Sequence, residues 1–70
     1  MSTLMQIVVN GESRQVPDGT TVAALIQSLQ LEPRRVAVEC NRQLVPRSAH
    51  ERTLLRESDQ LEIVTLVGGG

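Results

Sequence analysis

Three consecutive glycines, Gly68 to Gly70, end the sequence and directly follow a stretch that alternates like a β-strand. Glycine has no Cβ, so such a segment adopts backbone conformations closed to other residues and passes through channels too narrow for side chains. The four residues from Val67 span about 13–14 Å when fully extended. We therefore expect residues 67–70 to form a flexible tail that carries the carboxylate of Gly70 into another protein's active site.

A terminal carboxylate needs activation before it can transfer its acyl group, because its charge repels nucleophiles and its oxide is a poor leaving group. Transfer to AMP by a partner enzyme would make it reactive, and a sulfur nucleophile could then displace AMP to leave a thiocarboxylate. Glycine suits this chemistry because no side chain blocks attack on the carbonyl. The tail thus indicates a carrier whose end is modified by other proteins.

The remaining reactive side chains give weak signals for catalysis. Cys40 and His50 are the only cysteine and the only histidine, which excludes an internal disulfide and a cysteine metal cluster. Cys40 lies in an apolar run and is expected in the core, whereas His50 lies in a polar stretch and is expected on the surface. The carboxylates are scattered, with Asp18 and Asp59 expected in turns. No catalytic residue, metal site or bound cofactor is predicted.

Composition excludes several classes of partner. The net charge is −1, all seven basic residues are arginine, and Phe, Tyr and Trp are absent. Single-stranded nucleic acids are normally bound by stacking on aromatic side chains, and duplexes by a surplus of positive charge. No apolar run is long enough to span a membrane, and the first residues lack the features of a signal peptide. We expect a cytoplasmic protein that binds neither nucleic acid nor membrane.

The first half of the chain predicts a hairpin followed by a helix. Residues 5–10 alternate as a strand, Asn10-Gly11 favours a tight turn, and residues 12–16 would return antiparallel. This pairing places Arg14 opposite Ile7, which is unfavourable and suggests a slightly shifted register. A helix is expected from a cap at Thr20 or Thr21 to about Leu31, ended by Pro33. Its apolar stripe consists of Val22, Leu25, Ile26 and Leu29.

The second half predicts strands at residues 36–40, 43–45 and 60–66, with a loop or helical turn at 48–53. Leu54 and Leu55 are expected to anchor that loop on the core. Together the elements predict an α+β fold, a mixed sheet of about four to five strands with one main helix packed on one face. The domain is expected to cover residues 1–66, of which residues 1–4 are a possible N-terminal extension. The tail is expected to consist of residues 67–70.

Four segments give the chain a family resemblance: MQIVVNGE, PDGTTVAALIQSL, AVECNRQLVPRS and TLLRESDQLEIVTLVGGG. The most specific parts are the run from Asn41 to Arg47 and the ending from Ile63 to Gly70. On these residues the chain resembles the ThiS family, the sulfur-carrier proteins of thiamine biosynthesis, which have the β-grasp (ubiquitin-like) fold. One departure is Ser58, where the family usually has glycine, so the turn there is expected to differ.

The resemblance implies a function and a set of partners. Gly70 would be adenylated with ATP by an E1-like, ThiF-like adenylyltransferase, and a sulfur donor enzyme would then supply the thiocarboxylate sulfur. A ThiG-like thiazole synthase would receive that sulfur. By the same resemblance, Gly68 and Gly69 thread the active site of the partner, and Leu66 and Val67 form its apolar docking contacts.

Related functions remain alternatives. The small subunit of molybdopterin synthase shares the fold and the Gly-Gly ending, but normally has prolines and a serine before the glycines. The Leu66-Val67-Gly68 sequence favours thiamine instead. A carrier for molybdopterin or cysteine synthesis, a ubiquitin-like modifier that attaches Gly70 to lysines of other proteins, and a passive interaction module stay open.

Overall fold

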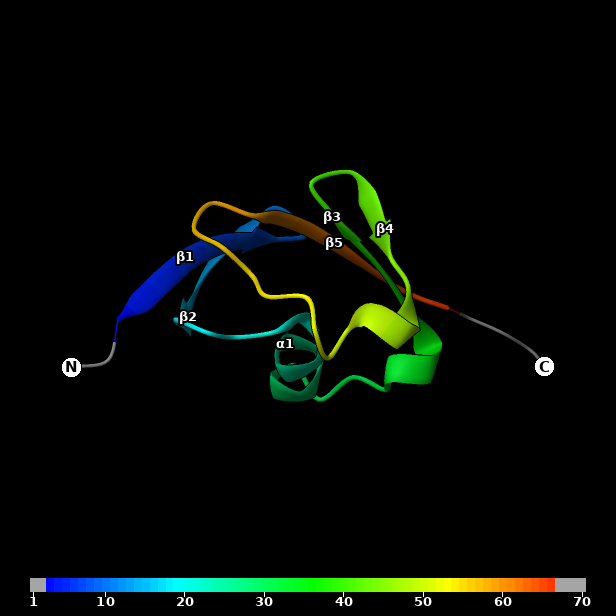
Figure 1. Cartoon of the computed structure of the whole chain (residues 1–70). Helices are drawn as coiled ribbons and strands as arrows, with labels where there is room; N and C mark the ends of the chain where they lie inside the picture. The colour runs from blue at the N-terminus through cyan, green and yellow to red at the C-terminus, as the bar shows by residue number, and fades with distance from the viewer. Residues whose placement is uncertain (1–2, 67–70) are drawn as a thin grey trace.

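The computed structural model describes residues 3–66, and within them five strands form one mixed sheet in the order β2-β1-β5-β3-β4. Helix α1 lies against one face of the sheet (Figure 1). The central strands β1 and β5 are parallel, and the other neighbouring strands are antiparallel. The predicted α+β architecture is confirmed. The strands are β1 (Leu4–Val9), β2 (Glu12–Pro17), β3 (Val36–Cys40), β4 (Gln43–Val45) and β5 (Gln60–Thr65); the helix α1 is Val22–Ser28.

The β1–β2 hairpin has the unshifted register. Asn10 and Gly11 both have positive φ, 51° and 83°, as a tight primed turn requires. Ile7 consequently pairs with Arg14, so the expectation of a shifted register was wrong. Because β2 is an edge strand, the long side chain of Arg14 reaches solvent past the sheet, and the residue is exposed.

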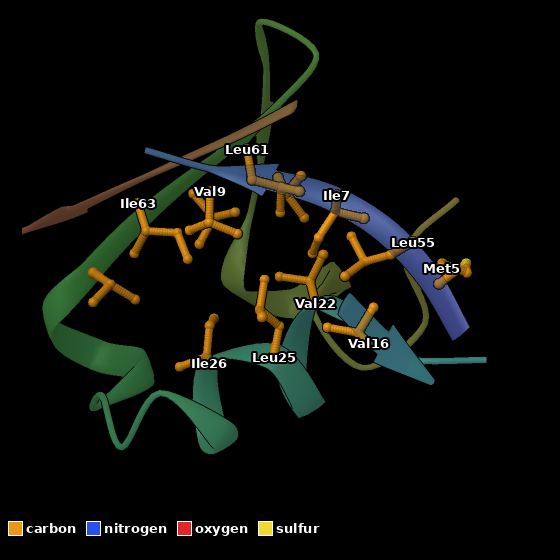
Figure 2. Close-up of a cluster of buried hydrophobic side chains, with 13 residues drawn as sticks. Met5, Ile7, Val9, Val16, Val22, Leu25, Ile26, Leu55, Leu61 and Ile63 are labelled. Atoms are coloured by element: carbon orange, nitrogen blue, oxygen red, sulfur yellow. The ribbon is translucent and has the colours of Figure 1, made fainter. Parts of the chain in front are cut away.

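The core fills the space between the sheet and α1, where apolar side chains from both point toward one another (Figure 2). The inward residues of β1 and β5 and the stripe of α1 are buried as predicted, with Leu29 partly buried. Leu55 is also buried, but Leu54 is 59% exposed, so its predicted role as an anchor was wrong. The largest fully buried side chains are Ile7, Val22, Leu25, Ile26, Val38 and Leu61.

Helix α1 begins as predicted and ends earlier. Thr21 is the N-cap, and its Oγ1 accepts a hydrogen bond from the N–H of Ala24 at 3.1 Å. The helix stops at Ser28 because Gln30 adopts a left-handed conformation, with φ 60°. The N–H of Leu31 then bonds to the carbonyl of Ile26 at 3.1 Å, the pattern of a Schellman cap. This cap, rather than Pro33, ends the helix.

The loop after β4 closes over the start of α1. It contains a 3₁₀ turn at Arg47–Ala49, and the carbonyl of His50 accepts a hydrogen bond from the N–H of Ala23 at 2.9 Å. This contact draws His50 inward, and the residue is only 4% exposed. Its Nε2 lies 3.1 Å from the carbonyl oxygen of Val45. The prediction of a surface histidine was therefore wrong.

The turn before β5 forms despite the serine. Ser58 adopts a positive φ of 71°, and its N–H donates to the carbonyl of Gln6 at 2.7 Å. Asp59 Oδ2 accepts a hydrogen bond from the N–H of Arg56 at 2.8 Å, which confirms the predicted turn role of this carboxylate. Ser58 thus takes the left-handed conformation that glycine adopts more easily, so the serine does not prevent this turn.

Candidate functional site

The candidate site begins where β5 leads toward the C-terminus. This strand lies in the middle of the sheet, between β1 and β3, and it pairs with β3 as far as Thr65 opposite Val36. The N–H of Leu66 continues the contact by donating to the carbonyl of Arg35 at 2.6 Å. The backbone of β5 is therefore held between β1 and β3, and Leu66 is bonded to Arg35, the residue that directly precedes β3.

The predictions for the tail itself fall on Val67, Gly68, Gly69 and Gly70, which lie outside the described residues. Their roles as docking contact, threading segment and covalent carrier stay predictions. Leu66 is described, and its side chain is 51% exposed, so it is accessible to a partner as its predicted docking role requires.

The side chain of Asn10 clamps β5 from the end of β1. Strand pairing between β1 and β5 covers Val8 with Gln60 and Val9 with Leu61. Beyond it, Asn10 Oδ1 accepts from the N–H of Ile63 at 2.8 Å, and Nδ2 donates to the Ile63 carbonyl at 3.1 Å. The amide thereby replaces a missing strand residue. The sequence analysis assigned Asn10 to the end of the first strand and to the turn, and gave its side chain no further role.

A second asparagine fixes the beginning of β5. Asn41, in the β3–β4 turn, accepts a hydrogen bond on Oδ1 from the N–H of Gln60 at 3.0 Å. Its Nδ2 donates to Asp59 Oδ1 at 3.0 Å. Both tight turns therefore supply an asparagine whose side chain positions the strand that leads to the tail. Asn41 also has a positive φ of 52°, which asparagine adopts readily in turns. The turn alone therefore explained an asparagine at this position, and its bonds to the start of β5 could not be predicted from the sequence.

Large apolar side chains are exposed on the face of the sheet opposite α1, at Leu4 on β1 and at three residues on the side of β4 and β5. Leu44 is 68% exposed, Val64 56% and Leu66 51%. Leu44 belongs to β4. Val64 follows the buried Ile63 on β5, and Leu66 comes two residues later, just after the strand ends. Sequence reasoning missed Leu44 and Val64, although an apolar residue at an outward position of an alternating strand was the available signal.

Cys40 and His50 do not form a catalytic pair. Cys40 is partly buried, and burial, the negative charge of Asp59 and a hydrogen bond to that carboxylate raise the pKa of the thiol to about 11. The thiol therefore stays protonated and weakly nucleophilic near neutral pH. His50 contacts Val45 instead. Cys40 and His50 therefore contact different residues, and each contributes to the folded structure rather than to a shared catalytic site.

Two further properties of the described part of the chain bear on function. Within residues 3–66, no group of three or more His, Cys, Asp or Glu side chains is placed to hold a metal ion. The helix in that part is too short to cross a membrane.

The model of the ThiS family matches residues 4–70 of the sequence. The chain belongs to the ThiS family. A thiazole synthase from Paramagnetospirillum magneticum is 42% identical over 66 residues, which are 94% of this chain and 20% of that protein. The chain therefore spans about a fifth of that relative. The sulfur carrier protein ThiS of Escherichia coli K12 is 30% identical over 94% of this chain and 100% of its own length.

A solved structure confirms the fold of this ThiS-family chain. The crystal structure of the thiamine biosynthesis protein ThiS from Geobacter metallireducens superimposes with a TM-score of 0.81 at 29% identity. The similarity covers 94% of this chain and 100% of the other. The five-stranded mixed sheet with one helix is thus the β-grasp arrangement that the sequence predicted.

Proposed function

We propose that this chain is a sulfur carrier of thiamine biosynthesis whose Gly70 bears the sulfur. The observation that supports it most strongly is the family match, which runs to residue 70 and so includes the terminal glycines. The carrier is a substrate of other enzymes and has no catalytic residue of its own. ATP is bound and used by the activating partner, an E1-like, ThiF-like adenylyltransferase.

The proposed chemistry has two steps. A carboxylate oxygen of Gly70 attacks the α-phosphorus of ATP, so that a C–O–P bond forms and pyrophosphate leaves. Hydrosulfide, or the equivalent sulfur from a donor enzyme, then attacks the acyl carbon. The bond to the AMP oxygen breaks, AMP leaves, and the chain ends in a thiocarboxylate. Neither step oxidises or reduces the chain.

The folded body acts as a handle in this proposal. Central strand β5 is held by β1, β3 and two asparagine side chains, so the position of Leu66 is defined relative to the sheet. From that fixed point Gly68 and Gly69 would thread the partner's active site, and Leu66 and Val67 would contact its entrance. A glycine-only end fits a narrow channel because it has no side chains.

A ThiG-like thiazole synthase is the proposed acceptor of the sulfur. Two proteins named thiazole synthase, from Paramagnetospirillum magneticum and Magnetococcus marinus, contain a segment 42% and 41% identical to this chain. A carrier-like segment within a synthase polypeptide supports a direct transfer between the two.

Intact-mass spectrometry tests the proposal. The purified chain is incubated with ATP, hydrosulfide and the activating enzyme encoded in the same genome. We expect the mass gain of one oxygen replaced by sulfur, localised to the C-terminal peptide. A chain lacking Gly70 serves as the control and should stay unchanged. No exchange in the full chain, or equal exchange in the shortened one, would contradict the proposal, and conjugates to lysines of other proteins would favour a modifier instead.

A further inference from the structure

Within residues 3–66, the last part of β5 has a neighbouring strand on one side only. Pairing with β1 ends at Leu61, because β1 turns into its hairpin at Asn10. Pairing with β3 continues as far as Thr65. The side chain of Ile63 is buried, whereas those of residues 64–66 are exposed. The end of β5 that leads toward the C-terminus is therefore neither buried nor enclosed between two strands.

On the open side, the backbone of β5 is held last by the side chain of Asn10. The backbone N–H of Asn10 donates to the Leu61 carbonyl at 2.9 Å. Its side-chain amide then bonds to the N–H and the carbonyl of Ile63, at 2.8 and 3.1 Å. A carboxamide carries a donor and an acceptor in one plane, so it takes the place of the next peptide group of β1. Among the described residues these are the last bonds on this side of β5, and Leu66 lies beyond them.

We propose that Asn10 is a positioning residue for the activation of Gly70, because its amide fixes the direction in which the end of β5 leaves the sheet. This inference rests on the proposed carrier function. With the amide in place, the backbone of residues 64–66 is ordered before the activating enzyme binds. Without it, β3 alone would hold this segment, which would then have to be ordered on binding at a cost in free energy. Asn10 touches no reacting atom and acts through Ile63.

Asn41 provides an internal comparison for Asn10. It occupies the corresponding position of the β3–β4 turn, with φ 52° against 51° for Asn10. Its side chain also makes two hydrogen bonds, but these go to Gln60 and Asp59 at the start of β5. The two asparagines thus share their turn position and number of side-chain bonds, and they differ in the end of β5 that they hold. Replacing each by glycine keeps the positive φ and removes the amide.

The kinetics of adenylation test the inference, measured as ATP–pyrophosphate exchange by the activating enzyme from the same genome with the full chain as substrate. For Asn10→Gly we expect KM to rise about tenfold, which corresponds to about 1.4 kcal/mol. The kcat should stay within about twofold, since the substitution changes only the cost of ordering the chain on binding. Asn41→Gly should leave KM and kcat within about twofold of the parent values. Asn10→Asp retains the acceptor for the N–H of Ile63, so it should raise KM less, and it replaces Asn10→Gly in the comparison if the glycine variant does not fold.

Amide hydrogen exchange of the free chain is the second measurement, and it does not depend on the enzyme. The N–H of Leu66, which donates to the carbonyl of Arg35, should exchange with solvent at least about fivefold faster in Asn10→Gly than in Asn41→Gly. Urea denaturation establishes that both variants are folded under these conditions. Equal KM values for the two variants, a defect confined to kcat, or equal hydrogen exchange at Leu66 would each overturn the inference. No adenylation of the parent chain would instead overturn the carrier function on which the inference rests.

Discussion

Asn10 and Ile63 lie 53 residues apart in the sequence and are joined by two hydrogen bonds, one at 2.8 Å and one at 3.1 Å. The side-chain amide of Asn10 meets both backbone groups of Ile63, just beyond the last pair of β1 and β5. A turn residue of the first hairpin thereby extends the pairing of the strand that leads to the tail. The stability of the domain and the position of β5 both depend on this contact.

Asn10→Gly should separate the two roles of this residue. Glycine keeps the positive φ of the turn but removes the amide, so the domain should lose about 1–2 kcal/mol of unfolding free energy for the two hydrogen bonds. Urea denaturation measures the change. Gly11 remains in place in the variant, and an unchanged midpoint would show that the Ile63 contacts contribute nothing.

Two residues in the left-handed conformation should be improved by glycine. Ser58 has φ 71° and Gln30 has φ 60°, and both are exposed. Ser58→Gly and Gln30→Gly should each stabilise the domain by about 0.5–1 kcal/mol, because relief of backbone strain exceeds the entropy lost by glycine. Gln27→Gly is the matched control inside α1 and should destabilise by about 0.5–1 kcal/mol. Stabilisation by all three variants would contradict the backbone explanation.

Cys40 gives a prediction for pH dependence. Burial first, and then the charge and hydrogen bond of Asp59, raise the pKa of the thiol from 9.0 to about 11. Because the folded pKa lies above the unfolded one, this contribution to stability is complete below pH 9 and is lost as the pH rises toward 11. Alkylation of the folded chain should therefore reach half its maximal rate near pH 11, and that of the chain in urea near pH 9. Coincident profiles would show that the fold leaves the thiol unperturbed.

The fold was predictable where period and turn chemistry agreed. Alternation placed Ile7 and Ile63 in the core, and Asn10-Gly11 fixed the first hairpin. The position of His50 could not be predicted in this way, because it depends on a contact between distant segments. His50 looks like a surface residue within its polar stretch, and it is buried because its carbonyl is drawn to the N–H of Ala23.

The parts of the candidate site that depend on local sequence were predictable, and those that depend on strand pairing were not. The glycine tail and Leu66 are local features, and sequence alone pointed to them. Leu44 and Val64 lie on one exposed face only through the pairing of β3 with β4 and β5, which no local pattern specifies. The amide clamp of Asn10 was concealed because the turn already explained an asparagine at that position.

The threading role of the tail predicts a defect in modification without a defect in folding. Gly69→Val adds a β-branched side chain to a segment proposed to pass through a narrow channel, and it lies beyond the strand that the sheet holds. Thiocarboxylate formation should fall at least about a hundredfold, a loss of about 2.7 kcal/mol in transition-state stabilisation, while the urea midpoint stays that of the parent chain. Intact-mass kinetics with the activating enzyme measure the rate of thiocarboxylate formation. Circular dichroism measures the urea midpoint, because the chain has no Phe, Tyr or Trp for fluorescence.

Gly69→Ala adds only one methyl group, so its rate of thiocarboxylate formation should lie between those of the parent chain and the valine variant. Normal modification of the valine variant would show that the channel tolerates side chains and that threading is not what the glycines provide.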